Sequence, residues 1–190
     1  MRLIPLAAAA LSVSLFAGQT MAYQAGDFYL RGEFSKADIN ADELSRENGF
    51  SLAGGFLFTN HLGIELGVGE ALEYDFTLET GNAGSMDIMP VNLLLQYYPL
   101  GGVANAPIQP FIGVGVNYTR FSGVSDGLSV DNDYGFAGQL GMDLVITDNI
   151  SATSFVRYAD VDAEFESGGQ TVDDVRLDPL TVGAGITYRF

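Results

Sequence analysis

The chain ends in Leu180-Thr-Val-Gly-Ala-Gly-Ile-Thr-Tyr-Arg-Phe190, and this stretch decides the fold. Apolar residues alternate along it with small or polar ones, so an extended strand would have one face that is apolar from end to end. That face would carry Leu180, Val182, Ala184, Ile186, Tyr188 and Phe190. The strands of a membrane barrel have this pattern because one face meets lipid and the other meets the lumen. Tyr188 and Phe190 would then lie at the membrane interface, where aromatic side chains gather.

The first residues of the chain predict export. Arg2 precedes an apolar run from Leu3 to Phe16, and the small residues Thr20 and Ala22 follow it. This order is typical of a secretory signal peptide, so we expect cleavage before Tyr23 and a mature domain of residues 23–190. The alternative is a membrane helix, but the run is shorter than the ~20 residues that a span needs.

Composition agrees with a single exported β domain. Hydrophobic residues make up 47% of the 190 residues, yet beyond the first 22 no run reaches the length of a membrane helix, so the apolar content is spread through alternation. The sequence holds no cysteine, which excludes disulfides, thiolate metal sites and a cysteine nucleophile. A formal net charge of −16 argues against nucleic acid as a partner, because its recognition needs a basic surface.

Alternation bounded by turn residues predicts an all-β domain of eight strands. An even number is expected for a single-chain bacterial barrel, and closure is required because lipid cannot satisfy a free strand edge. The predicted strands are Asp27 to Lys36, Phe50 to Phe58, Gly63 to Phe76, Asp87 to Tyr98, Pro110 to Phe121, Tyr134 to Ile146, Ser151 to Ala163 and Val175 to Phe190.

The connections alternate between two kinds. Three are short, at 59–62, 99–107 and 147–150, and four are longer and acidic, at 37–49, 77–86, 122–133 and 164–174. This alternation predicts an antiparallel transmembrane barrel with periplasmic turns, extracellular loops and both termini on the periplasmic side. Eight strands leave room for side chains or one small ligand, which disfavours a wide pore. A soluble eight-stranded carrier is the competing fold, but it would turn its apolar face inward.

Five motifs resemble the OmpW family in order and spacing. They are Tyr23-Gln-Ala-Gly-Asp-Phe-Tyr-Leu-Arg31, Thr59-Asn-His-Leu-Gly-Ile-Glu-Leu66, Pro110-Phe-Ile-Gly-Val-Gly-Val-Asn-Tyr-Thr-Arg-Phe121, Arg157-Tyr-Ala-Asp-Val-Asp162, and Val175-Arg-Leu-Asp-Pro179 with Tyr188-Arg-Phe190. The resemblance covers the whole mature chain. It implies an eight-stranded barrel of the bacterial outer membrane with a hydrophobic channel that admits small apolar molecules and releases them sideways into the membrane.

One position departs from the pattern of that family. Its members often have tryptophan before the tyrosine of the seventh strand, where it helps to close the channel. This sequence has Arg157 before Tyr158 and contains no tryptophan. Any gate must therefore be built from other residues.

Alternation also identifies the residues that should face the lumen. Ala53, Leu57, Leu94, Phe111, Ala137 and Val145 should point inward, which makes the lumen partly apolar and motivates a hydrophobic ligand. We take Leu57, Leu94, Phe111, Val145 and Arg157 as the candidate ligand path, against the alternative that they simply fill a narrow barrel. Charged and amide residues on the same face should pair with one another. These are Arg31, Glu33, Glu65, Gln96, Gln139, Asp143, Arg157 and Arg189.

Catalysis has little support. His61 is the only histidine, and the topology places it in a periplasmic turn, so we predict no catalytic residue and no cofactor. Asp131-Asn-Asp133 begins like a calcium loop, but the twelfth position is Met142 rather than glutamate, so no metal site is predicted. The acids at 160, 162, 164 and 166 are expected to form a solvated rim, which divalent cations could bridge to lipopolysaccharide.

The sequence thus predicts an integral outer-membrane channel for small hydrophobic solutes, with lateral release into the membrane. Its expected partners are outer-membrane lipids and lipopolysaccharide, apolar solutes, and the barrel-assembly machinery through the C-terminal strand. The alternative is a structural or adhesive barrel that transports nothing. The lumen distinguishes the two, because a continuous apolar path favours transport and paired charges throughout favour the structural function.

Overall fold

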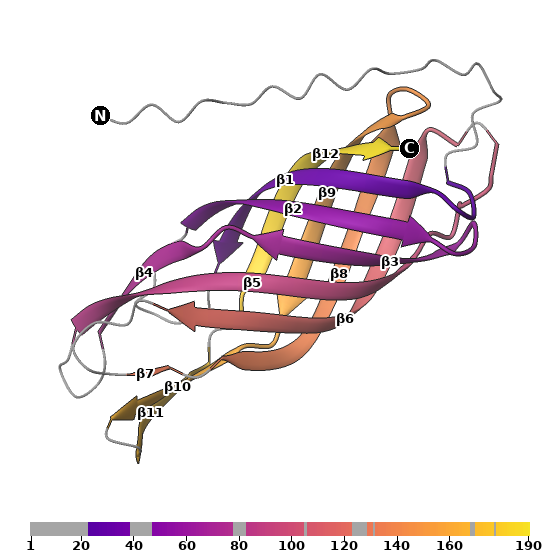
Figure 1. Cartoon of the computed structure of the whole chain (residues 1–190). Coiled ribbons are helices and arrows are strands. Elements are labelled where there is room, and N and C mark those ends of the chain that lie inside the picture. The colour runs from indigo at the N-terminus through magenta and orange to yellow at the C-terminus, as the bar shows by residue number, and fades with distance from the viewer. Residues whose placement is uncertain are drawn as a thin grey trace, which may run out of the picture.

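The computed structural model describes residues 23–38, 47–77, 83–104, 106–122, 129–130, 132–167, 170–176 and 178–190. The expected signal peptide, residues 1–22, lies outside the described residues. The remainder forms an antiparallel barrel that encloses a narrow lumen (Figure 1).

Eight strand paths form the wall, and three of these paths are divided in two. The undivided strands are β1 (Phe28–Asp38), β2 (Glu47–Leu57), β5 (Ala83–Tyr97), β6 (Ile108–Ser122) and β8 (Asp133–Val145). The divided paths are β3 (Leu62–Gly69) with β4 (Leu72–Thr77), β9 (Ile150–Ala159) with β10 (Asp162–Ser167), and β11 (Gln170–Arg176) with β12 (Leu180–Arg189). A two-residue strand, β7 (Ser129–Val130), pairs with β10.

The barrel closes because the first strand pairs with the last. The order is β3-β2-β1-β12-β9-β8-β6-β5-β4, and a further pairing of β3 with β5 completes the ring. Register partners can be followed once around the barrel, starting from position 57 of β2. They return to β2 at position 47, ten residues away, so the shear number is 10. Such a stagger requires strongly tilted strands, which are evident in Figure 1.

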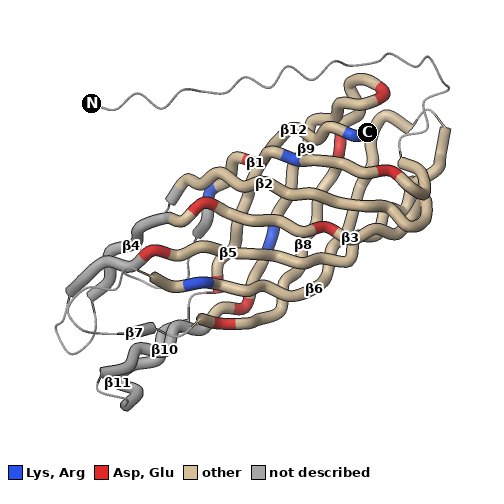
Figure 2. The backbone as a smooth tube through the Cα atoms, viewed as in Figure 1, with Lys and Arg blue, Asp and Glu red and all other residues tan. Residues whose placement is uncertain are grey.

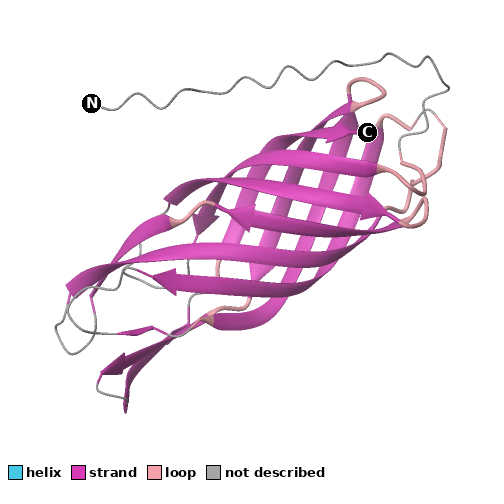
Figure 3. Ribbon diagram, in the orientation of Figure 1, coloured by secondary structure: helices cyan, strands magenta, loops and turns pink. Residues whose placement is uncertain are grey.

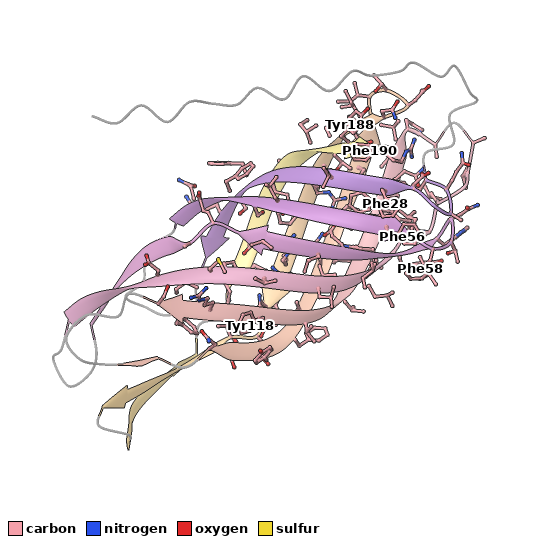
Figure 4. The ribbon with its side chains drawn as sticks, in the orientation of Figure 1. Phe28, Phe56, Phe58, Tyr118, Tyr188 and Phe190 are labelled. Carbon is pink, nitrogen blue, oxygen red and sulfur yellow. The ribbon has the colours of Figure 1, made fainter. Side chains whose placement is uncertain are left out.

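The outer surface of the wall is an apolar band between two sets of aromatic rings. Leu52, Leu140 and Ile186 are more than half exposed, as expected for side chains that meet lipid rather than water. Figure 4 shows Phe28, Phe56, Phe58, Tyr188 and Phe190 near one end of the barrel and Tyr118 toward the other. Tyr118 packs on Tyr134, with 4.7 Å between ring centres. Charged residues are sparse along the backbone in Figure 2.

We call the end with the turns at 58–61, 98–107 and 146–149 the periplasmic end, and the opposite end the extracellular end. The described start of the chain, Tyr23, and the C-terminal residue Phe190 both lie at the periplasmic end, as the loop lengths predict. Phe190 N donates a hydrogen bond to Phe28 O at 2.9 Å, which ties the last residue to the start of β1.

The eight predicted strands are confirmed, but one predicted loop is wrong. Residues 164–174 were expected to form an acidic loop, whereas most of them belong to the hairpin of β10 and β11. The error has a physical cause, because acids at every second position are a strand pattern as much as a rim pattern, and Gly168-Gly169 between the two strands is a typical hairpin sequence. Figure 1 shows this hairpin reaching beyond the wall at the extracellular end.

The breaks within three strand paths were not predicted. They fall between β3 and β4, between β9 and β10, and between β11 and β12. Asp178 has a positive φ of 36° and precedes Pro179, so the last break combines an unusual backbone conformation with a residue that cannot donate to a ladder.

Within the described residues, no helix is long and apolar enough to cross a membrane. Figure 3 shows strands and loops throughout that part of the chain.

Candidate functional site

The periplasmic end of the lumen is filled by an aromatic plug, which we define as Tyr23, Tyr29, Leu57, Tyr98 and Phe111. All five side chains are between 0% and 2% exposed. The rings of Tyr23 and Tyr98 stack with centres 4.4 Å apart, and those of Tyr98 and Phe111 lie 5.7 Å apart. Val145 packs against the same group. A solute of any size would have to displace these rings to pass.

Tyr23 reaches the plug from outside the strands. The segment 23–27 crosses the end of the barrel, where Gly102 N donates to Tyr23 O at 2.9 Å and Gly26 N donates to Leu57 O at 2.6 Å. The φ of Gly26 is +96°, a conformation that favours glycine. The Tyr23 hydroxyl donates to the Asp143 carboxylate inside the lumen. Burial raises the pKa of Tyr23 well above its ordinary value, so this hydroxyl remains a donor.

Above the plug lies a first ionic cluster centred on Arg31. Its guanidinium bonds Glu65 at 2.7 Å and Asp143 at 3.3 Å, and its Nε donates to Thr187 at 2.9 Å. The Tyr29 hydroxyl and the Gln96 amide donate to Glu65 at 2.7 and 3.1 Å. The guanidinium carbon also lies 4.9 Å from the centre of the Phe111 ring, which joins this cluster to the plug.

A second cluster pairs Arg157 with Glu33. The Arg157 Nη2 lies 3.1 Å from Glu33 Oε2, and its Nε donates to Gln139 Oε1 at 2.6 Å. Ser51 donates to the same carboxylate at 2.9 Å. The two clusters touch where Arg31 lies 3.9 Å from Glu33. They therefore form one continuous polar network across the lumen.

Among the described residues, this network holds more negative than positive charge. Glu33, Glu65 and Asp143 are 0–1% exposed, and they share the two guanidinium groups of Arg31 and Arg157. Hydroxyl and amide donors around each carboxylate supply the remaining stabilisation. An anion that entered this region would meet an excess of carboxylates.

Nearer the extracellular end, one side of the lumen carries a neutral polar strip, which we define as Asn92, Asn117 and Thr119. Thr119 Oγ1 donates to Asn117 Oδ1 at 2.6 Å, and Asn117 Nδ2 donates to Asn92 Oδ1 at 3.0 Å. All three residues are at most 5% exposed. Buried Ala53, Ala137, Ile88, Phe121 and Val161 also belong to the lumen here. This half of the lumen is therefore mixed in polarity and carries no charge-rich plug among its described residues.

The wall next to the strip is interrupted at Pro90. β5 pairs with β6 through Pro90 without a break, whereas its pairing with β3 ends at Val91 and resumes with β4 at Ile88. Proline has no N–H to donate, and the break on this side indicates that the missing donor faces β3 and β4. A Cβ on Gly69 would lie 2.8 Å from the Pro90 ring, so glycine allows the ring to fill the break. At positions 89 and 90, β5 has no ladder pairs with β3 or β4, and the Pro90 ring lies close to Gly69 instead.

The sequence-predicted path residues all point inward, but they do not lie together. Leu57 and Phe111 belong to the plug, and Val145 packs against it. Leu94, 1% exposed, and Arg157, 8% exposed, lie closer to the extracellular end. The predicted inward charges are also buried, except that Arg189 sits at the periplasmic rim, 3.5 Å from Asp27. A role for the five residues in ligand passage stays a prediction.

Sequence reasoning missed the tyrosines of the plug. Tyr29 alternates with inward Arg31 and Glu33 on β1, so strand parity could have identified it. Tyr98 ends the predicted strand Asp87 to Tyr98 and has the parity of inward Leu94 and Gln96, so alternation could have identified it as well. In the structure, Tyr23 lies before β1 and Tyr98 lies just after β5. Their burial follows from the turns that hold them.

No catalytic or metal-binding cluster emerges from the described residues. His61 is exposed in the periplasmic turn, as expected, and its ring centre lies 6.4 Å from that of Tyr97. No group of three acidic or histidine side chains in the described ranges could hold a metal ion. Asp131, the start of the calcium-loop pattern, lies outside the described residues.

Comparison with known proteins identifies relatives over the whole domain. The sequence model of the OmpW family matches residues 32–190. Outer membrane protein W of Salmonella typhi is 31% identical over 218 aligned residues, which cover 100% of both chains. Among solved structures, OprG of Pseudomonas aeruginosa is similar with a TM-score of 0.77 and 25% identity, covering 90% of this chain and 98% of that one. Outer Membrane Protein W of E. coli is similar in fold, with a TM-score of 0.65 and 24% identity over 88% of this chain and 99% of that one.

Proposed function

The chain belongs to the OmpW family, and from this premise we propose that it is a channel that admits small hydrophobic molecules at the extracellular end and releases them sideways into the membrane. It is an integral barrel of the outer membrane. The proposal concerns what enters the lumen and where it leaves.

The observation that carries the proposal is the filled periplasmic half of the lumen. The aromatic plug and the network around Arg31 leave the side chains there almost without exposed surface. Moving a solute through them would break buried ion pairs, each of which costs about 3–5 kcal/mol when one partner is lost. A solute that enters from outside therefore needs an exit before it reaches the plug.

The break at Pro90 supplies the best candidate for that exit. It lies beside the neutral strip, on the extracellular side of the charged network, and the Pro90 ring rather than a hydrogen-bonded ladder closes it. Separating Gly69 from the Pro90 ring breaks no ladder pair between β5 and its neighbours β3 and β4, because that ladder has none between Val91 and Ile88. Because the outer face of the wall is apolar, a hydrophobic solute that leaves here enters lipid directly.

The same buried charges favour a second candidate, a structural or adhesive barrel. Paired charges and rings fill the lumen from Tyr23 to Arg157, which excludes an open pore along this length and would suit a barrel that transports nothing. Transport is preferred because, among the described residues, the buried ion pairs stop short of the extracellular end, where the break in the β5 ladder lies.

Outer-membrane lipids and lipopolysaccharide are the proposed surroundings. Lys36 and Arg120 are exposed on the outward faces of β1 and β6, toward the extracellular end. Basic side chains near the extracellular end of the outer surface can bind the phosphate groups of lipopolysaccharide through charge-assisted hydrogen bonds.

Uptake by cells tests the two candidates against each other. Cells with and without the protein are given a panel of small apolar compounds, and the initial rate of accumulation is measured at equal folded protein level. We expect the protein to raise the rate for apolar compounds and to leave polar compounds of equal size unaffected. Equal rates with and without the protein across the panel would favour the structural barrel.

A further inference from the structure

The neutral strip ends at Asn92, whose amide nitrogen has no acceptor among the described residues. Its bonds run in one direction, from the Thr119 hydroxyl to Asn117 and from the Asn117 amide to Asn92 Oδ1. The orientation of the Asn92 amide follows from this chain, because its oxygen must be the atom that accepts from Asn117. Asn92 Nδ2 donates to no described residue. Since chains of hydrogen bonds polarise one another, this terminal donor is a strong one.

A second unused donor faces the same part of the lumen. Gln139 is 2% exposed, and its Oε1 accepts from Arg157 Nε at 2.6 Å, so its amide nitrogen must be the other atom. Gln139 Nε2 is buried and has no hydrogen-bond partner. Unpaired buried N–H groups are rare, and each is costly unless something accepts from it.

The two donors flank a shallow part of the wall. Asn92 on β5 is the register partner of Asn117, and Gln139 on β8 is the partner of Gly113, so the two residues lie on either side of β6, four residues apart along it, with inward Gly115 midway. Gly115 contributes no side chain, and its register partners on the two strands are Leu94 and Ala137. This part of the lumen face therefore has a glycine at its centre, one apolar side chain on each flank, and two amide donors.

We propose that Asn92 and Gln139 form a head-group subsite that binds the oxygen of an uncharged carbonyl or hydroxyl group on an otherwise apolar solute. Two donors without an acceptor can both be satisfied by one oxygen atom that accepts two hydrogen bonds. A carbonyl or hydroxyl oxygen can accept two, whereas an alkane has no acceptor. Leu94 and Ala137 contact the apolar part of the solute. The inference deepens the proposed function, on which its biological meaning rests, by naming small oxygenated hydrocarbons as the preferred class.

Charge excludes carboxylates from this class. Glu33 lies on the other side of Arg157, and the buried network already holds three carboxylates for two guanidinium groups. The net charge of −16 adds repulsion at longer range. The subsite should thus prefer 2-hexanone or 1-hexanol over both hexane and hexanoate.

The test is ligand binding to the folded protein in nanodiscs, measured by saturation-transfer NMR with empty nanodiscs as background. Gln139→Glu keeps the acceptor for Arg157 and removes the free donor, and Asn92→Asp does the same at the end of the strip. Each should weaken 2-hexanone binding about fivefold, the effect of one lost hydrogen bond, and leave hexane binding unchanged. Gln139→Met repeats the test without adding a charge.

Gln109→Glu is the matched control, because it makes the same exchange at a buried glutamine on the periplasmic side of the charged network. It should leave 2-hexanone binding unchanged. The subsite would be overturned if the wild type bound hexane and 2-hexanone with equal affinity, or if the variants lost affinity equally for both ligands. It would also be overturned if neither ligand bound, because water alone would then occupy the site. Uptake by cells is scored separately, so selective binding without uptake would contradict the channel function and leave the subsite standing.

Discussion

At the scale of single residues, large inward side chains lie over glycines on the neighbouring strand. Tyr29 is the register partner of Gly55, and Phe111 is the partner of Gly141. A Cβ on Gly55 would lie 2.1 Å from the Tyr29 ring, and one on Gly141 would lie 2.3 Å from the Phe111 ring. Inward direction could be predicted from alternation at these positions. The ring-on-glycine contacts could not, because they depend on strand register.

Gly55→Ala should destabilise the barrel. Tyr29 is buried and its hydroxyl donates to Glu65, so its ring cannot move away without losing this hydrogen bond and its packing contacts. Overpacking of this kind costs about 1–3 kcal/mol. Urea unfolding in detergent, followed by the mobility shift of the folded band, measures the change. Gly54→Ala is the control, since its Cβ would lie 3.5 Å from Leu30 on the lipid side, and an equal loss there would contradict the explanation.

Arg31→Met should destabilise more strongly, because it leaves Glu65 and Asp143 without their shared cation. Loss of one partner of a buried ion pair costs about 3–5 kcal/mol. The same unfolding measurement applies, with Lys36→Met as the control for losing an exposed, outward cation on the same strand. Adding Asp143→Asn to Arg31→Met should recover part of the lost stability, because it removes a carboxylate that has lost its cation. A further, additive loss of stability would show that Arg31 does not balance the charge of Asp143.

At the scale of strands, alternation predicted all eight paths and the two faces of each. It did not predict where a path breaks, because a break depends on how neighbouring strands pair. Pro90 shows the difference, since a proline within a strand suggests an edge or a bulge, but the sequence does not say which neighbour loses the bond. The hairpin of β10 and β11 was mistaken for a loop because it carries acids at alternate positions.

Deleting Phe190 should lower the folded fraction in the membrane, because this residue completes the outward face of β12 and bonds Phe28 through its backbone. Its ring packs edge-on against Tyr188, with centres 4.9 Å apart. Heat-modifiable migration of membrane fractions measures the folded amount. Phe190→Tyr keeps both contacts and should fold normally, whereas normal folding of the deletion would show that the closing strand does not need its last ring.

At the scale of the whole molecule, closure follows from the pairing of β1 with β12, and the filling of the lumen divides it into two unequal parts. The periplasmic part is sealed by rings and ion pairs, and the extracellular part adjoins the break at Pro90. The sequence predicted that inward charges would pair, but it did not predict that three of the five path residues gather at the seal. That result depends on the stagger of ten residues around the barrel, which no single strand encodes.

The orientation in the membrane can be tested by surface labelling, which is simple because the chain has no native cysteine. Cysteines at positions 126 and 166 should react with an impermeant maleimide on intact cells, because position 126 falls in the predicted long connection 122–133 and position 166 lies in β10 of the extracellular hairpin. Cysteines at His61 and Asp148, which are exposed in short turns, should react only after the outer membrane is opened. Labelling of the two turn positions on intact cells would reverse the orientation.

Lateral release is the central claim, and a reversible staple across the wall break tests it most directly. Gly69→Cys combined with Pro90→Cys places two thiols where the proline ring now meets Gly69. A staple between Leu66 and Leu93, register partners on the same two strands, is the control. Oxidation of the 69–90 pair should reduce uptake of apolar compounds to the rate of cells that lack the protein, and reduction should restore it, while the control staple leaves uptake unchanged. Undiminished uptake through a fully oxidised, folded 69–90 staple would contradict release at this break.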